Sequence, residues 1–284
     1  MTQLSVKDHN RNAAGLTYIY PVISRRSGGL SIGVNFNTNN ACNWRCAYCQ
    51  VPELSLGAAP DIDFQLLEAE LTDFLHDVLQ GDFYDRFEMA PELRVINDIA
   101  ISGNGEPTSV KGFSEAIKLI IRVTEQAKIP YPFQYVLITN GSLVHHADVQ
   151  AGLKIFNQYN GQVWFKLDSA SQEGRELINH CALSIQKHTQ NLLTSAALCS
   201  TWVQSCMLTF KSGQGLSNTG EQQAYLNLLQ QVLEQVPLQG VLLYSLARES
   251  MQPEATQISS VTEQQLNDFA QKIRQLGLIV KASL

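Results

Sequence analysis

Short apolar runs that read as strands alternate along this chain with longer segments of helical period. The expected strands cover residues 32–37, 98–102, 135–139, 163–167, 203–210 and 240–246. The expected helices cover residues 64–79, 113–126, 146–157, 183–198, 222–236 and 262–276. Because crossover helices return each strand in the same direction, this alternation predicts an α/β fold with a parallel sheet.

The chain has 284 residues, of which 44% are hydrophobic and 16% charged, and it shows no repeat or linker. We expect one domain over residues 1–284, with an N-terminal extension and β-hairpin (1–30), a core (31–250) and a C-terminal helix and strand (251–284). No apolar segment approaches the eighteen or so residues of a membrane span, and the N-terminus lacks an apolar export stretch. We therefore expect a cytoplasmic protein without membrane contact.

Two local patterns refine this picture. Alternating apolar residues flank Arg25-Arg26-Ser27-Gly28-Gly29, which predicts a hairpin that leads into the first core strand. The run Ser260-Val-Thr-Glu263 is typical of a capping box at the start of the last helix.

Three cysteines, Cys42, Cys46 and Cys49, form a C-x3-C-x2-C run. Thiolates are the usual ligands of iron-sulfur clusters, so three of them suit a four-iron cluster whose fourth iron stays open. Zinc is the main alternative, but it prefers a fourth Cys or His at close spacing, and the nearest histidines are His9 and His76. A disulfide would need an oxidising compartment, which the absence of an export stretch disfavours.

The cysteine run, with Tyr48 before its last cysteine, resembles the radical S-adenosylmethionine (SAM) superfamily. A second motif supports the resemblance: Gly103-Asn104-Gly105-Glu106-Pro107 follows an apolar strand and is similar to the family's Gly-Gly-Glu-Pro. The resemblance implies an open, partial β/α barrel of about six strand-helix units with the site at the C-terminal strand ends. It also implies a 4Fe-4S cluster on the three cysteines and SAM, whose amino group the Gly-Glu motif holds.

Polar residues follow every expected core strand, where ligands collect in parallel α/β sheets. Among them, Asn140 is a candidate cofactor residue. By resemblance, Asp168 and Ser169 would meet the SAM ribose and Tyr48 the adenine. Lys166 and Arg248 are cations that could hold a carboxylate, although both also suit ordinary surface ion pairs. Tyr244 is a further substrate-site candidate.

The remaining cysteines are Cys181, Cys199 and Cys206, and none follows Cys206. The C-terminal cysteine array of family members with auxiliary clusters is therefore absent, which indicates a one-cluster protein. All three read as small buried hydrophobes, except that Cys206 could present its thiol to a substrate radical. Within the superfamily the chain most resembles the MoaA-like and wybutosine-synthesis enzymes, without the MoaA-type cysteines.

Charge bears on the substrate. The net charge is -6. Residues 53–92 carry eleven Asp or Glu against a single basic residue, Arg86, whereas residues 1–50 carry five Lys or Arg against a single acidic residue, Asp8. A tRNA would therefore have to contact the N-terminal side, through Arg25 and Arg26. The resemblance implies reductive cleavage of SAM to a deoxyadenosyl radical that abstracts hydrogen from an RNA base or nucleotide-derived molecule. It further implies an external reductant of the flavodoxin or ferredoxin type. Modification of a peptide or protein, and a non-catalytic iron-sulfur or zinc protein, are the alternatives.

Overall fold

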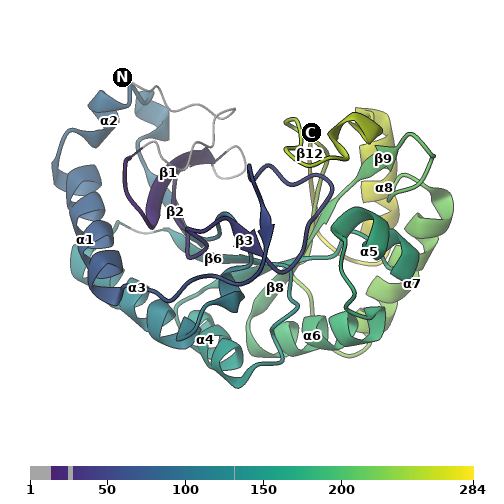
Figure 1. The fold of residues 1–284 in the computed structure, drawn as a ribbon, viewed down its shortest axis with the longest axis horizontal. Coiled ribbons are helices and arrows are strands. Elements are labelled where there is room, and N and C mark those ends of the chain that lie inside the picture. The colour runs from purple at the N-terminus through teal and green to yellow at the C-terminus, as the bar shows by residue number, and fades with distance from the viewer. Residues whose placement is uncertain (1–13, 25–27, 131) are drawn as a thin grey trace.

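The structure is a computed structural model that describes residues 14–24, 28–130 and 132–284. Its main sheet runs in the order β1-β2-β5-β6-β7-β8-β10-β12 and curves inside a layer of helices (Figure 1). The strands are β1 (Ile19–Ser24), β2 (Gly29–Val34), β5 (Ile96–Ile101), β6 (Gln134–Thr139), β7 (Gln162–Lys166), β8 (Ser200–Cys206), β10 (Gly240–Tyr244) and β12 (Val280–Ser283). Every neighbouring pair is parallel except β1 and β2. The predicted partial β/α barrel is confirmed.

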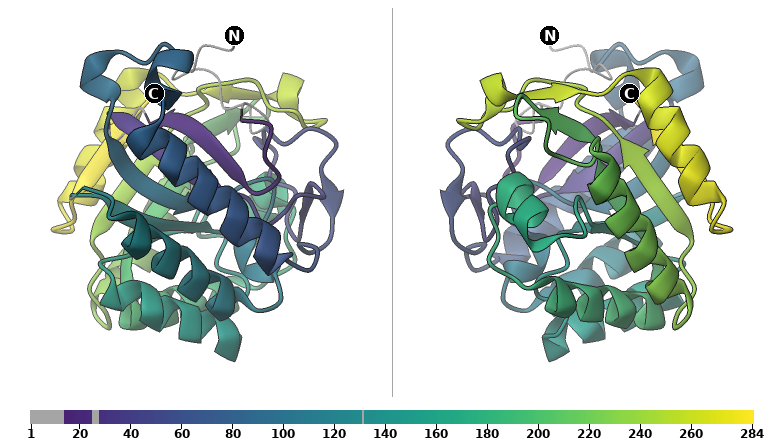
Figure 2. Two further views of the ribbon diagram at one scale, coloured as in Figure 1. Left: turned by 90° about the vertical axis from the view of Figure 1, so that its left-hand side faces the viewer. Right: turned by 90° about the vertical axis from the view of Figure 1, so that its right-hand side faces the viewer.

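The outer layer contains the helices that connect these strands. They are α1 (Phe64–Gln80), α2 (Phe83–Arg86), α3 (Phe113–Ala127), α4 (Ala147–Gln158), α5 (Gln172–Asn179), α6 (Ile185–Leu198), α7 (Thr219–Leu233) and α8 (Glu263–Arg274), with short 3-10 turns η1 (Pro91–Leu93), η2 (Pro107–Ser109) and η3 (Ala255–Gln257). The two side views show α1, α3, α4, α6, α7 and α8 packed along the outside of the sheet (Figure 2), whereas the end of α5 lies against residues 45–47. Because each helix turns an apolar face inward, such as Leu67, Leu71 and Phe74 of α1, the core lies between the two layers.

The N-terminal hairpin is confirmed, since β1 pairs antiparallel with β2 from Ile19–Val34 to Ser24–Gly29. Its predicted turn residues Arg25, Arg26 and Ser27 lie outside the described residues. At the other edge, β12 adds a parallel strand beyond the six that were predicted for the core. The sheet thus has seven parallel strands in the described part of the chain, with β1 antiparallel at one edge.

Two predicted strands, 32–37 and 203–210, differ clearly from the structure. The first core strand ends at Val34 rather than residue 37, because the Asn37 backbone N–H donates to Asn35 Oδ1 (3.1 Å) in a side-chain turn. The predicted strand 203–210 is divided into β8 and β9 (Leu208–Phe210). There β9 leaves the barrel and pairs antiparallel with β11 (Ile258–Ser260).

Two helix predictions also need correction. The capping box of α8 uses Thr262 and Gln265, not Ser260 and Glu263, because the helix begins two residues later than the pattern indicated. Helix α5 was not predicted at all, because it is short and mostly polar; Ser171 starts it by accepting from the Gly174 N–H (2.9 Å).

Within the described ranges, no helix combines the length and the apolar character needed to cross a bilayer.

Candidate active site

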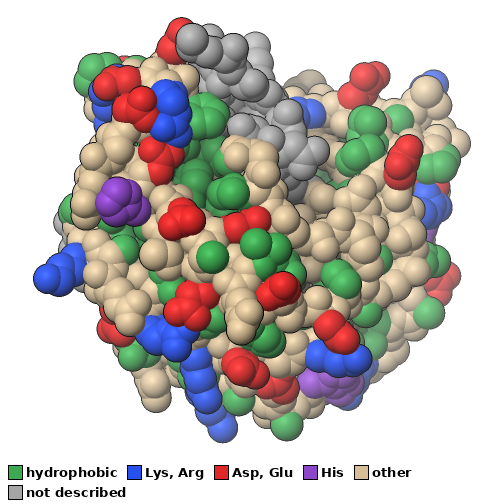
Figure 3. All heavy atoms as spheres, turned by 60° about the vertical axis from the view of Figure 1, so that its left-hand side comes forward, with side chains coloured by type: hydrophobic (Ala, Val, Ile, Leu, Met, Phe, Trp, Pro, Cys, Tyr) green, Lys and Arg blue, Asp and Glu red, His purple; other side chains and the backbone are tan. Residues whose placement is uncertain are grey.

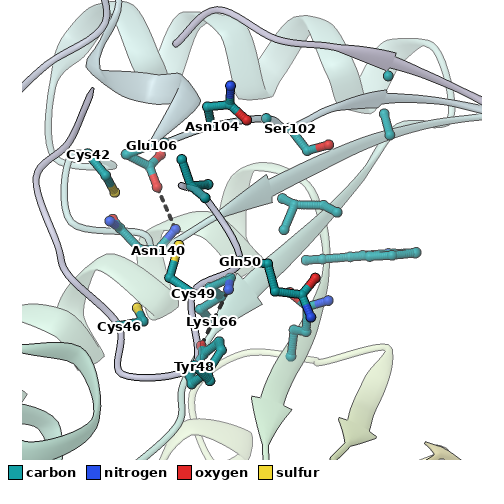
Figure 4. Close-up of a pocket in the computed structure, with 18 of the residues that line it drawn as sticks. Cys42, Cys46, Tyr48, Cys49, Gln50, Ser102, Asn104, Glu106, Asn140 and Lys166 are labelled. Atoms are coloured by element: carbon teal, nitrogen blue, oxygen red, sulfur yellow. Dashed lines mark hydrogen bonds between the residues drawn. The ribbon is translucent and has the colours of Figure 1, made fainter. Parts of the chain in front are cut away.

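The three motif cysteines lie on one loop that follows β2 and crosses the C-terminal mouth of the barrel. Cys42 belongs to β3 (Ala41–Cys42), which pairs with β4 (Ser55–Leu56), and Cys46 and Cys49 bracket a turn closed by the Cys49 N–H and the Cys46 carbonyl (2.9 Å). All three are free thiols and line a single cavity. Figure 4 shows their sulfur atoms facing a common region beside Asn140. The topology therefore assembles the donor set that the spacing predicted.

The C-terminal end of helix α5 holds one side of this loop. The Ala47 and Arg45 N–H groups donate to the carbonyls of Ile178 (2.7 Å) and Asn179 (3.2 Å) at the end of α5. The Asn179 side-chain amide donates to Cys46 Sγ (3.3 Å). Carbonyls in the last turn of a helix have no partner inside the helix, so the loop supplies the donors that α5 lacks. Sequence reasoning missed Asn179, whose only signal was its place after the strand-end run at residue 168.

Two further contacts hold the other side of the loop. The Ser250 hydroxyl donates to the Ala47 carbonyl (2.7 Å), and the Met251 N–H donates to the Cys49 carbonyl (2.9 Å). Residues 200 positions away in the chain thus position the third cysteine, which no local pattern could reveal.

Burial makes free thiolates unfavourable at Cys42 and Cys46. Burial raises the pKa of Cys42 to about 11 and that of Cys46 to about 12, so both stay protonated at neutral pH until a metal displaces the proton. The Trp44 N–H donates to Cys42 Sγ (3.5 Å), which resembles the N–H bonds that tune iron-sulfur clusters. Among the described residues, no three His, Cys, Asp or Glu side chains are grouped as ligands of a single ion. Three thiols around one cavity fit a cluster.

The Gly-Asn-Gly-Glu loop after β5 packs directly against the start of the cysteine loop. A Cβ on Gly103 would lie 2.1 Å from Asn35 Oδ1, and one on Gly105 would lie 2.0 Å from the Ala41 carbonyl oxygen. Both distances are far below van der Waals contact, so only glycine permits this approach. Asn104 bridges the two loops, since its side-chain amide donates to Asn40 Oδ1 (2.6 Å).

Glu106 is buried, with 2% of its surface exposed, and lines the cavity. Its Oε1 accepts from the Thr108 N–H (3.1 Å), the Thr108 hydroxyl (2.5 Å) and the Thr139 hydroxyl (2.6 Å). Its Oε2 accepts from the Asn140 N–H (2.6 Å; Figure 4). Burial raises the pKa of Glu106, and these four donors oppose the rise. A carboxylate has about four acceptor sites on its two oxygens, so Oε2 keeps acceptor capacity toward the cavity.

Asn140 extends the network from the end of β6 to the cysteine loop. Its side-chain amide donates to Asn43 Oδ1 (2.8 Å), and the Asn43 amide donates to the Ser142 hydroxyl (2.8 Å). The His188 ring lies 2.8 Å from the Asn140 carbonyl and therefore donates to it from Nε2. Asn43 and His188 were not singled out from the sequence, although Asn43 sits inside the cysteine run.

Tyr48 and Lys166 line the cavity, whereas Asp168 lies behind them. The Tyr48 hydroxyl donates to Asp168 Oδ2 (2.5 Å), and Lys166 Nζ donates to the Tyr48 oxygen (3.3 Å). Asp168 is 2% exposed and also accepts from the Asn179 amide (2.7 Å) and the Cys206 N–H (2.8 Å). These bonds place Asp168 as a positioning residue for Tyr48 and Asn179.

The other predicted residues divide into those at the cavity and those away from it. Arg248 and Tyr244 line the cavity, and Arg248 donates to Gln50 Oε1 (3.0 Å). Pro107 begins η2, outside the cavity lining. Ser169 and Cys206 are fully buried beside it, and the Ser169 hydroxyl donates to Glu221 (2.6 Å). The positions of Asp168, Ser169 and Cys206 give no support to the direct ligand or radical contacts expected of them.

Lys166 has a pKa above its ordinary range. Burial alone would lower it, but the partial and full negative charges of Tyr244, Cys46 and Asp168 outweigh that effect. The ammonium therefore stays charged in the cavity wall, where it faces anionic groups of any ligand.

Several acidic side chains of residues 53–92 form ion pairs with arginines, so this segment is less acidic in the structure than its sequence indicates. Arg86 pairs with Asp77 (2.5 Å) and Asp82, Arg94 pairs with Asp85 (2.7 Å), and Arg122 of α3 pairs with Glu68 of α1 (2.7 Å). Figure 3 shows acidic side chains over this face with basic ones interspersed. Arg25 and Arg26, the expected tRNA contacts, lie outside the described residues.

Comparison with known proteins gives little at the level of sequence. No family model matches the chain. The GTPase Obg of Brachyspira hyodysenteriae is 29% identical over 135 residues, which make up 48% of this chain and 17% of that protein. The chain thus spans well under two thirds of Obg. It also contains no Gly-Lys pair, which the phosphate-binding loop of P-loop NTPases requires.

The fold comparison is more informative. The chain is similar to a spore photoproduct lyase mutant with dinucleoside spore photoproduct, with TM-score 0.53 and 10% identity over 86% of this chain and 73% of that chain. It is also similar to TYW1 with a lysine-pyruvate adduct bound, with TM-score 0.50 and 14% identity over the same shares. The curved parallel sheet agrees with this likeness, which is one of fold.

Proposed function

We propose that this protein is a radical SAM enzyme in which Cys42, Cys46 and Cys49 hold a 4Fe-4S cluster and Glu106 helps to hold SAM. The observation that carries the proposal is the convergence of these four side chains on one cavity of about 370 Å³. Motifs about sixty residues apart meet there because the strands that precede them, β2 and β5, are parallel neighbours.

Each residue has a task that its chemistry supports. The cysteine thiols would release their protons to solvent as they bind the metal, and the Trp44 backbone N–H and the Asn179 side-chain amide would stabilise the resulting charge on sulfur. Glu106, held by four donors, offers acceptor capacity on Oε2 to an ammonium group. When bound, the two cofactors supply one-electron radical chemistry. The protein's part is to bind them in contact and to exclude water.

Lys166 supports the same assignment from the opposite wall. Its charged ammonium lies over the Tyr48 ring, 5.0 Å from the ring centre, and Tyr48 is held in turn by Asp168. An ammonium fixed in this way can bind the carboxylate of an amino acid. The cavity therefore offers an anion for an amine and a cation for a carboxylate, which are the two ends of the methionine part of SAM.

The substrate is proposed to be an RNA base or a nucleotide-derived molecule, and the electrons to come from an external flavodoxin-type or ferredoxin-type reductant. A peptide substrate is the second enzymatic candidate. A non-catalytic iron-sulfur or zinc protein is the third, and iron and sulfide analysis together with a SAM-binding titration would separate it from the other two.

Two measurements test the proposal. Anaerobically reconstituted protein should bind about four iron per chain. Cys46→Ala should lose the iron, whereas Cys199→Ala, which removes a buried thiol outside the cavity, should keep it. Stoichiometric zinc without visible absorbance would overturn the cluster.

The second measurement concerns SAM. Glu106→Gln should keep iron but weaken SAM binding by roughly tenfold to a hundredfold, because a charge-assisted hydrogen bond contributes about 1.5 to 3 kcal/mol. Glu173→Gln, on the exposed surface of α5, is the matched control. Parent-like SAM cleavage by Glu106→Gln under dithionite would contradict the role of Glu106.

A further inference from the structure

A buried arginine lies behind the cysteine loop. Arg175 of α5 is 1% exposed and is among the largest fully buried side chains in the described part of the chain. It precedes Asn179 by four residues, so the two side chains lie on the same face of the helix. Because Asn179 donates to Cys46 Sγ (3.3 Å), the face of α5 that carries Arg175 is turned toward the cysteine loop.

Trp44 connects Arg175 to this loop. The guanidinium carbon lies 5.8 Å from the centre of the Trp44 ring. Trp44 stands between Cys42 and Cys46 in the sequence, and its backbone N–H donates to Cys42 Sγ (3.5 Å). Trp44 lines the cavity, whereas Arg175 does not. The arginine therefore lies behind the loop and not among the side chains that face a ligand.

The hydrogen-bond partners of Arg175 carry no full negative charge. Its Nη1 donates to the Leu183 carbonyl (2.6 Å) and its Nη2 to Cys181 Sγ (3.3 Å), while Nε finds no acceptor within the described ranges. Burial raises the pKa of the Cys181 thiol, so this sulfur is protonated at neutral pH. Among the described residues, no carboxylate forms an ion pair with Arg175.

The charge of Arg175 is therefore only partly balanced in the fold. Burial lowers its pKa, and Cys181 and then Asp168 oppose the fall, but an arginine stays charged in proteins. Asp168 is also among the groups that keep Lys166 charged, so one buried carboxylate faces two cations. A neutral donor would satisfy the Leu183 carbonyl equally well, and an unpaired buried charge is costly. The fold alone gives no reason for a cation here.

The cysteine loop supplies a reason. Thiolates that bind a metal bring negative charge to the loop, and the electron that reduces a cluster adds more. The charge of Arg175 acts on groups packed against Trp44: after burial, it is the next cause of the low pKa of His188, whose ring lies 5.3 Å from that of Trp44. A fixed positive charge at this place stabilises a reduced cluster more than an oxidised one.

Resting on the proposed function, we propose that Arg175 is the counter-charge of the cysteine loop and raises the reduction potential of the cluster held there. The step concerned is the transfer of one electron from the external reductant to the cluster, in which no bond forms or breaks. Arg175 contacts neither cofactor nor substrate, so it acts through its charge and through Trp44. Net charge and hydrogen bonds near the sulfurs are the means by which a protein sets such a potential.

The test is an anaerobic redox titration of the reconstituted full chain, followed by the electron paramagnetic resonance signal of the reduced cluster. Arg175→Met should lower the ratio of reduced to oxidised cluster at a fixed potential roughly tenfold, a shift of about 59 mV to more negative potential. One unit charge about 12 Å away has this effect at an effective dielectric constant of about 20. Arg175→Lys, which keeps the charge, should retain most of the parent potential. Arg274→Met, which removes an exposed charge on α8, is the control.

A second pair of variants keeps the test decisive if Arg175→Met fails to fold or to bind iron. Cys181→Asp places a carboxylate beside Nη2 of Arg175 and should shift the potential in the same direction as Arg175→Met. Cys181→Ser, which keeps a neutral side chain of similar size, should leave the potential unchanged.

The outcomes separate this inference from the proposed function, because iron and sulfide are measured on every sample. Equal potentials for the parent protein, Arg175→Met and Cys181→Asp at full iron content would overturn the inference alone. Equal shifts in Cys181→Asp and Cys181→Ser, or in Arg175→Met and Arg175→Lys, would also overturn it, because the charge would then not be the cause. A parent protein without iron and sulfide would overturn the proposed function itself, and the inference with it.

Discussion

His188 should make the stability of this fold depend on pH. Its ring, 1% exposed, lies on α6 between Trp44 of the cysteine loop (5.3 Å between ring centres) and Phe165 of β7 (4.9 Å). Burial, and to a lesser degree the nearby charge of Arg175, lower its pKa from 6.5 to about 3. The folded state therefore holds the neutral ring down to about pH 3, while the unfolded chain takes up a proton near pH 6.5. Stability from this residue is complete above pH 6.5 and is lost progressively as the pH falls toward 3.

The magnitude follows from proton linkage. One proton taken up only by the unfolded state changes the free energy of unfolding by about 1.4 kcal/mol per pH unit below the unfolded pKa. Between about pH 7.5 and about pH 5.5 the contribution of His188 should fall by about 1.4 kcal/mol. His188→Gln removes the titration but keeps a donor for the Asn140 carbonyl, so its stability should depend less on pH by this amount.

The assay is urea unfolding of the protein without its cluster, monitored by circular dichroism at both pH values. Removing the cluster keeps acid loss of metal out of the comparison. His76→Gln, which changes an exposed histidine of α1, should behave like the parent protein. If the parent and His188→Gln lose the same stability between the two pH values, the ring does not stay neutral in the fold and the reasoning fails.

Two further predictions concern the loops around the cavity. Gly105→Ala places a methyl group 2.0 Å from the Ala41 carbonyl and should displace the cysteine loop, so iron uptake should fall at least severalfold. Gly220→Ala, an exposed change at the start of α7, should keep normal uptake, and equal uptake by the two variants would show that the loops need not touch. Arg45 donates to both oxygens of Glu254 (2.8 and 2.9 Å), and these bonds lower the pKa of Glu254. The ion pair therefore stabilises the fold at neutral pH, and this stabilisation is lost as acid protonates the carboxylate. Because the pair is partly exposed, Arg45→Met should reduce the free energy of unfolding by no more than about 1 kcal/mol at pH 7 and by less near pH 4. The same loss of stability at both pH values would contradict the ion-pair explanation.

The sequence alone determined the main features of the fold and the metal donors. Apolar period distinguishes strands such as β6 from helices such as α3, and their alternation leaves a parallel sheet as the simple solution. The cysteines were recognisable because all three metal ligands sit within eight residues of one loop. Glu106 was recognisable because it closes a glycine turn directly after an apolar strand.

The tertiary structure decided which polar residues reach the cavity and which support it. Asp168, Ser169 and Asn140 all follow strands, but only Asn140 lines the cavity, because Tyr48 and α5 cover Asp168. Asn179 and His188 were not recognised in the sequence, since each has a partner in the site that is more than thirty positions away. A local sequence pattern indicates which conformation a residue prefers within its own turn or strand. Which side chains meet at the mouth of a barrel depends on how distant strands and helices pack, and that packing is set by the whole core.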